Sequence, residues 1–200
     1  MKKNDFLIQY FEKRKSKIIK FFILFLLGFL IVLTISNNFS PKNYIAKVHI
    51  EGIINNKDEL IKKLNDINHN KNIKGLLIIV NSPGGTFVSS KEILDVLEKI
   101  SGKIPTSAYM REMATSGAYL ASLGAKKIFA NQGTITGSIG VILQTAQLTS
   151  LMEKIGVKPI IIKSGELKAT PNPLEKLDDE KLQYLKKIIG QLQNEFVDIV

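Results

Sequence analysis

The sequence has no cysteine and no tryptophan, and its only histidines are His49 and His69. The missing thiols exclude disulfides, thiolate nucleophiles and cysteine-based metal sites. The two histidines lie in unlike sequence contexts, so they form neither a zinc-binding pair nor a two-histidine helix motif. We therefore expect no metal site in this chain.

The 200 residues carry a formal net charge of +10, but the excess is unevenly spread. Residues 1–20 contain seven basic side chains against two acidic ones, which is half of the excess. Elsewhere acidic residues are interleaved, and no aromatic and basic stripe of the kind that stacks bases is present. A nucleic-acid partner is not expected.

The basic start leads into the run "IIKFFILFLLGFLIVLTI", residues 18–35, which is uninterrupted by polar side chains from Phe21 to Leu33. An 18-residue helix is about 27 Å long, close to the hydrocarbon core of about 30 Å. A cleaved signal peptide is the alternative, but Thr34-Ile35-Ser36 matches an A-x-A-like cleavage site poorly. We predict an uncleaved transmembrane signal anchor over residues 18–35.

The excess of lysine and arginine before this run orients the predicted anchor. The positive-inside rule predicts a single span that follows a cytoplasmic basic N-terminus over residues 1–17, and residues 36–43 form a polar linker after it. The domain over residues 44–200 is then periplasmic or extracellular.

Apolar periodicity in that domain alternates between strand and helix spacing. Strands are predicted over 44–50, 73–80, 104–110, 126–130 and 157–163, and helices over 57–69, over 89–100 and from Ser116 onward. This alternation predicts an α/β fold with a parallel sheet and right-handed crossovers. Ligand sites in such sheets lie beyond the carboxyl ends of the strands, where loops lead into helices.

The loop "NSPGG", residues 81–85, directly follows the most hydrophobic strand. Its adjacent Gly84 and Gly85 let the backbone approach a ligand and direct N–H groups at it, as an oxyanion hole requires. A plain Pro-Gly turn is the alternative interpretation. The loop lacks the Gly-Lys-Ser/Thr ending of a P-loop, so nucleotide binding is disfavoured.

Ser116 begins a helix of small residues after the third predicted strand, with Gly117 as a second N–H donor. It is either a helix cap or a nucleophile, and a nucleophile needs a base. Neither histidine is expected beside this loop, whereas a neutral lysine can act as the base. Lys168 lies in the loop "KSGELKATPNP", although the residues alone favour an exposed, solvated lysine there.

Four motifs occur in order: "NSPGG", "MATSGAYLAS", "IFANQGTITGSIGV" and "KSGELKA". Because these four motifs occur in this order, residues 44–200 resemble the bacterial signal peptide peptidase A family. Its members are membrane-anchored serine peptidases of the Clp protease/crotonase fold. The resemblance implies repeated β-β-α and βαβ units around a mainly parallel sheet. It also implies that Ser116 is the nucleophile, Lys168 the general base and Ser138 the residue that orients the lysine, with Gly117 and Gly84 or Gly85 forming the oxyanion hole.

The resemblance further implies a bacterial endopeptidase that needs no cofactor. Such an enzyme degrades cleaved signal peptides and other hydrophobic peptides at the outer face of the cytoplasmic membrane, in contact with the lipid bilayer. Family members form ring-like homo-oligomers in which neighbouring subunits complete each active site. This chain differs at Ala169, where aspartate is common in the family, and at residues 172–174, "NPL", near the family's Ser-Pro. Family domains also continue beyond the helix in which this sequence stops, so we expect a last strand and helix to be missing.

Two other functions remain open at this point. One is a catalytically inactive, membrane-tethered assembly protein of the same fold. The other is a crotonase-like acyl-CoA enzyme, which the predicted outward topology disfavours because coenzyme A thioesters are cytoplasmic.

Overall fold

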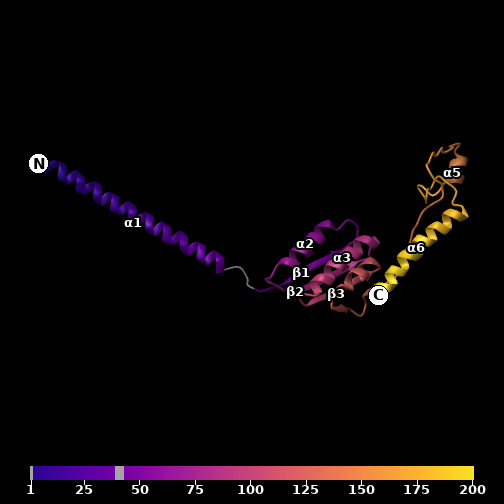
Figure 1. Cartoon of the computed structure of the whole chain (residues 1–200), viewed down its shortest axis with the longest axis horizontal. Coiled ribbons are helices and arrows are strands. Elements are labelled where there is room, and N and C mark those ends of the chain that lie inside the picture. The colour runs from indigo at the N-terminus through magenta and orange to yellow at the C-terminus, as the bar shows by residue number, and fades with distance from the viewer. Residues whose placement is uncertain (1, 39–42) are drawn as a thin grey trace. The chain divides into compact units, whose positions relative to one another are not determined.

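The computed structural model describes residues 2–38 and 43–200, without the side chains of 2–13, 16 and 34–38 (Figure 1). The chain divides between Asn43 and Tyr44 into two compact units, and each is described by itself. Met1 of the predicted basic segment and residues 39–42 of the predicted linker lie outside the described residues.

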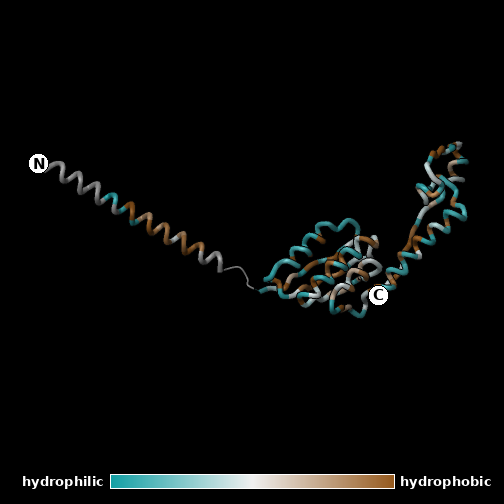
Figure 2. Tube along the Cα trace, in the orientation of Figure 1, coloured by the Kyte–Doolittle hydropathy of each residue, from teal (hydrophilic) through white to brown (hydrophobic). Residues whose placement is uncertain are grey.

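The first unit contains one long helix, α1 (Lys2–Asn38). Its apolar side chains from Ile18 to Leu33 are exposed, and they form the brown stretch of this helix in Figure 2. Within the described part of the chain, no helix combines the length and apolar character needed to cross a bilayer. The anchor predicted over residues 18–35 therefore receives no support from the structure, and the side chains of Thr34 and Ile35 are outside the described residues.

The second unit is built on a parallel sheet, which confirms the predicted α/β class. Strands β1 (Tyr44–Glu51), β2 (Ile73–Ser82), β3 (Thr106–Thr115) and β4 (Lys127–Ala130) are neighbours in that order. A short fifth strand, β5 (Ile135–Gly137), also pairs in parallel with β3, beyond the residues that β4 occupies. The carboxyl ends of β2 and β3 therefore meet at one edge of the sheet, as the sequence pattern predicts.

Helices α2 (Asp58–His69), α3 (Phe87–Ser101) and α4 (Gly117–Ser122) follow the first three strands. They pack with the sheet into one hydrophobic core that includes Ile50, Leu64, Ile78, Val80, Ile93, Leu97 and Met110, each at most 2% exposed. Burying a side chain of this size stabilises the fold by about 1.5–3 kcal/mol. The core thus fixes the strand ends from which the functional loops emerge.

The remaining helices are α5 (Thr149–Lys154) and α6 (Asp179–Ile199), and Figure 1 shows α5 at the end of α6 remote from the C-terminus. The prediction of a strand over residues 157–163 is wrong, because no strand forms there. Its apolar side chains are unburied, with Ile160 87% and Ile162 94% exposed. β-Branched residues favour a strand only where a neighbouring strand and a packed face are available, and this segment pairs with no described strand.

Candidate active site

Ser116 lies at the turn from β3 into α4, with a φ of 52° and a ψ of −124°. A positive φ costs a residue with a Cβ about 1–3 kcal/mol, so the surroundings must hold it. The Ser116 N–H donates to the Gly137 carbonyl at 2.7 Å, and the Ser116 carbonyl accepts from Leu120 N–H at 3.0 Å. Its side chain makes no capping hydrogen bond in the part of the chain that the structure describes. A strained strand-to-helix turn with an uncommitted hydroxyl is typical of a hydrolase nucleophile and disfavours the cap interpretation.

Three glycines allow the Ser116 turn and the "NSPGG" loop to pack against each other. Gly84 has a φ of 96°, and a Cβ there would lie 2.7 Å from both Gly117 N and Thr115 O. A Cβ on Gly85 would lie 1.9 Å from the Ile54 carbonyl oxygen, and one on Gly117 would lie 2.1 Å from Ser90 Oγ. Gly84 is therefore required by space where the loop meets the Ser116 turn, while Gly85 and Gly117 are required chiefly by their contacts with Ile54 and Ser90.

Hydrogen bonding distinguishes the possible oxyanion donors. The Gly84 N–H donates to Ser82 Oγ at 3.1 Å, and Ser82 Oγ donates in turn to the Gly52 carbonyl at 2.6 Å. Among the described residues, the N–H groups of Gly85 and Gly117 have no acceptor. They are also adjacent, because the Cβ direction of Gly117 points to within 3.2 Å of Gly85 N. Of the two sequence candidates, Gly85 is thus the better partner for Gly117, while Gly84 shapes the loop.

A cavity of about 100 Å³ opens beside these groups. Its lining comprises Gly85, Phe87, Ser116, Gly117, Leu120, Gly140, Val141, Ile142 and Phe196. Phe196 comes from α6, is 2% exposed and meets Phe87 edge to face at 6.2 Å between ring centroids. Apart from the Ser116 hydroxyl, the side chains that line the cavity are apolar, while backbone groups contribute polar surface beside them, and the space suits a small side chain.

Sequence reasoning missed the apolar residues of this cavity. The motif "TGSIGV" contains Gly140 and Val141, and it offered a signal because it follows the strand that holds Ser116 in place. Phe196 had no such signal, since its position depends on how α6 packs.

The structure brings together Ser116, Gly117, Gly84 and Gly85. Ser138 directly follows Gly137, whose carbonyl accepts the hydrogen bond from the Ser116 N–H. Ser138 is exposed and has a φ of 54°. Lys168 is exposed in the segment between α5 and α6, where its N–H donates to the Gly165 carbonyl at 3.1 Å. No lysine that the structure describes lines the Ser116 cavity. Within one chain the predicted dyad is therefore not assembled.

The segment that carries Lys168 is held by its own charges. Lys163 Nζ donates to the Glu166 carbonyl at 2.9 Å and pairs with Glu175 at 3.0 Å. Lys181 pairs with Asp178 at 3.1 Å, and its backbone N–H donates to the Asp178 carboxylate at 2.9 Å. That backbone hydrogen bond is the main cause that lowers the pKa of Asp178, while the side-chain bond to Asp178 raises the pKa of Lys181. The loop around Lys168 is thus ordered independently of Ser116.

Metal ligation has little basis at this site, since within the described residues no three histidine, aspartate or glutamate side chains cluster to hold an ion.

Residues 98–200 match the model of peptidase family S49. The chain belongs to this family. A protein of Enterococcus faecium, named provisionally as signal peptide peptidase SppA, is 36% identical over 82% of this chain and 45% of its own length. Protease 4 of Haemophilus influenzae is 34% identical over 70% of this chain and 25% of its own length. The predicted family and the predicted enzyme class, a serine-type peptidase, are confirmed by these matches.

The chain spans about half the length of some curated relatives that it matches, such as 58% of a Synechocystis protein with which it shares 36% identity, and less of others. Among solved structures it is similar to a mutant of the 1510-N membrane-bound stomatin-specific protease. That similarity has a TM-score of 0.47 and 24% identity, and it covers 53% of this chain and 52% of the other.

Proposed function

We propose that the chain is a serine endopeptidase in which Ser116 attacks a peptide carbonyl and the N–H groups of Gly85 and Gly117 bind the resulting oxyanion. The observation that supports this most directly is the strained Ser116 turn beside two adjacent N–H groups, which have no acceptor among the residues that the structure describes. Backbone donors of this kind lower the barrier of acyl transfer by about 3–4 kcal/mol each.

In this proposal neutral Lys168 accepts the Ser116 proton as the Oγ–C bond forms, and Ser138 orients the lysine. Lys168 then gives that proton to the leaving amine as the peptide C–N bond breaks. It next accepts a proton from water as the water oxygen bonds to the acyl carbon, and returns that proton to Ser116 Oγ as the Oγ–C bond breaks and the second product leaves. Protein groups supply every proton transfer, so the reaction needs no cofactor.

Lys168 must come from a neighbouring copy of the chain if it is to reach Ser116 in this arrangement. Two features support a homo-oligomer with shared sites: Lys168 is exposed, and the segment around it carries exposed Ile155, Val157, Ile160 and Ile162. Large apolar side chains gathered on a surface mark a protein interface. The interface would then supply the base.

The proposed substrates are apolar peptides, in particular signal peptides after their cleavage. The apolar side chains that line the cavity at Ser116, among them Phe87, Ile142 and Phe196, support this class, as does the name of the Enterococcus relative. A substrate of this kind occurs at a membrane.

The proposed location is the outer face of the bacterial cytoplasmic membrane, with α1 as the anchor and its basic start in the cytoplasm. The exposed apolar side chains of Ile18 to Leu33 and the basic residues before them support this location. After expression in bacterial cells, alkaline carbonate should leave the chain in the membrane fraction, and protease added to spheroplasts should digest residues 44–200. Release by carbonate would rule out the anchor.

The shared dyad has a direct test. Ser116→Ala and Lys168→Ala should each lower peptide cleavage at least about a thousandfold, as loss of a nucleophile or its base does. When the two inactive variants are mixed and reassembled, sites that pair a wild-type Ser116 with a wild-type Lys168 should restore about a quarter of the activity. Lys158→Ala, an exposed lysine of the same segment, is the matched control and should retain full activity.

Full activity in either single variant would refute the dyad, and no recovery on mixing would refute sharing between copies. The inactive assembly protein is the second candidate, because Lys168 and Ser116 are apart within one chain. A fluorophosphonate probe that fails to label Ser116 in folded, assembled protein would favour it.

A further inference from the structure

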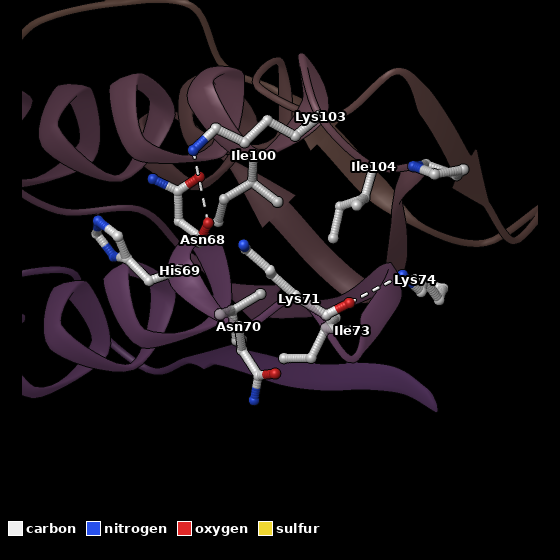
Figure 3. A pocket seen from close by; sticks show the side chains of 11 residues that line it. Asn68, His69, Asn70, Lys71, Ile73, Lys74, Ile100, Lys103 and Ile104 are labelled. Carbon is white, nitrogen blue, oxygen red and sulfur yellow. Dashed lines mark hydrogen bonds between the residues drawn. The ribbon is translucent and has the colours of Figure 1, made fainter. Parts of the chain in front are cut away.

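The edge of the sheet opposite Ser116, where β2 and β3 begin, carries a second and larger cavity. Its volume is about 520 Å³ (Figure 3). Apolar side chains line part of it, namely Ile67, Ile73, Ile100 and Ile104. The charged residues that line it are Lys71, Lys74 and Lys103, with His69 beside them. An apolar lining with a cationic border suits an amphiphilic anion.

A neighbouring cavity of about 330 Å³ extends this surface. It shares Lys103, Ile104 and Pro105 with the first cavity and adds Lys126 and Lys127. Within the part of the chain that the structure describes, no acidic residue lines either cavity. We refer to the surface with these five lysines as the basic face.

The lysines of the basic face have no carboxylate partners among the described residues. Lys74 Nζ donates to the Lys71 carbonyl at 2.8 Å, and Lys103 Nζ donates to the Asn68 carbonyl at 3.5 Å. Figure 3 shows Lys71 and Lys103 directing their ammonium groups toward the Asn68 end of the cavity. Their charges are thus available to an external anion.

The basic face is also where the second unit begins. The Tyr44 N–H donates to the Asn72 carbonyl at 3.0 Å, and Asn70 Nδ2 donates to the Tyr44 hydroxyl at 2.9 Å, so the start of β1 is bonded to the loop that carries Lys71.

We propose that the basic face binds the anionic headgroups of a phospholipid bilayer. Lysines near an anionic leaflet attract its headgroups, and the apolar lining accepts the adjacent glycerol and upper acyl carbons. Among the described residues, no Phe, Tyr or Trp lines either cavity, so His69 is the one ring there on which a nucleic-acid base could stack. This inference rests on the proposed membrane location and not on the proposed chemistry.

The test uses the full chain, which has no native cysteine and so accepts one fluorophore at a chosen position. Gly102→Cys places it in the smaller cavity, where an added Cβ meets nothing closer than 3.6 Å. Ile53→Cys, 63% exposed just beyond the carboxyl end of β1, is the control position. The labelled chain is reconstituted in phosphatidylcholine vesicles, with or without about one third phosphatidylglycerol, that contain a headgroup quencher.

We expect quenching at position 102 to exceed that at position 53 by at least about threefold in phosphatidylglycerol vesicles, and this difference to vanish in phosphatidylcholine alone. Replacing Lys71, Lys74 and Lys103 by glutamine should abolish the difference. Replacing the exposed Lys154, Lys158 and Lys187 by glutamine removes the same charge elsewhere and should preserve it. Equal quenching at the two positions, or quenching independent of lipid charge, would overturn the proposal.

Two further readouts separate this proposal from the others. Cleavage of a soluble peptide in detergent should be unchanged in the variant with glutamine at positions 71, 74 and 103, so a failed dyad test leaves the lipid result intact. Carbonate extraction reports on α1 alone. If short duplex DNA competes with the vesicles and removes the quenching at position 102 while the anchor still holds, a nucleic-acid surface replaces the lipid assignment.

Discussion

The loops around Ser116 and the segment over residues 155–178 contribute to one proposed reaction, yet they are built in opposite ways. Around Ser116, backbone bonds to Gly137 and Ile54 hold the loops over a core in which Ala114, Ala118 and Leu120 are fully buried. In the other segment Ile160 and Ile162 are almost fully exposed, and order comes from ion pairs such as Lys163 with Glu175. The loops around Ser116 bury their apolar side chains and pair their backbone groups within the chain. The segment over residues 155–178 instead leaves an apolar surface that another molecule can cover.

The largest effect should come from making that apolar surface charged. Ile160→Lys combined with Ile162→Lys should dissociate the oligomer and lower peptide cleavage at least about a hundredfold, because the base no longer reaches the neighbouring Ser116. Stability of the single chain should change by no more than about 0.5 kcal/mol, since both side chains are already exposed. Sedimentation velocity and turnover, measured together, check this.

Ile53→Lys, a change of the same kind at a side chain 63% exposed elsewhere, serves as the control and should alter neither quantity. If the double variant keeps both its oligomeric mass and its rate of peptide cleavage, the exposed apolar surface is needed neither for assembly nor for catalysis.

A smaller loss of peptide cleavage is expected when the loops around Ser116 are changed. Gly85→Ala would place a Cβ 1.9 Å from the Ile54 carbonyl oxygen, and the backbone shift should cost about 2–3 kcal/mol of unfolding free energy. Turnover should fall at least about tenfold, because the displaced Gly85 N–H no longer meets the oxyanion. Thermal unfolding and kinetics of the same preparation measure both.

Gly133→Ala is the matched change, since nothing lies within 4 Å of its Cβ direction. If Gly85→Ala behaves like Gly133→Ala, the close packing of the two glycine loops is not needed.

The smallest effect concerns the charges that order the segment near Lys168. The pKa of Asp178 is lowered in the folded chain, so its stabilising effect is present above its ordinary pKa and is lost as pH falls through the folded value. Acidification below about pH 4 should therefore loosen the first turn of α6. Asp178→Asn keeps a good helix cap but removes this titration, so its helix content should stay flat where the wild type declines. Hydrogen exchange of the Lys181 amide across this pH range tests it, and identical profiles would exclude Asp178 as the cause.

The first four strands and the loops at Ser116 were predictable because a single chain determines them. Alternation of apolar and polar residues marked the strands, and parallel strands bring their carboxyl ends together, so Gly84, Gly85 and Ser116 were expected to meet. The predicted strand over 157–163 failed because its β-branched residues need a partner strand that the described chain does not supply. Phe196 could not be predicted, since its contact with Phe87 joins residues more than a hundred positions apart. Lys168 was found through the family motif, and its meeting with Ser116 stays a prediction.

The neighbour relations in the sheet follow the order of the chain, since β1 pairs with β2, β2 with β3 and β3 with β4. Pairing of these neighbouring strands closes loops of about thirty residues, whereas the contact of Phe87 with Phe196 closes a loop of more than a hundred, so the strand contacts cost less loop-closure entropy. We expect the sheet to assemble progressively as the chain emerges, while the distant α6 docks afterwards. Pulse-labelled amides of β1 to β3 should then be protected before the Phe196 amide, and simultaneous protection would disprove that sequence. Under such an order, Ser116 reaches its strained conformation before Phe196 closes the cavity beside it.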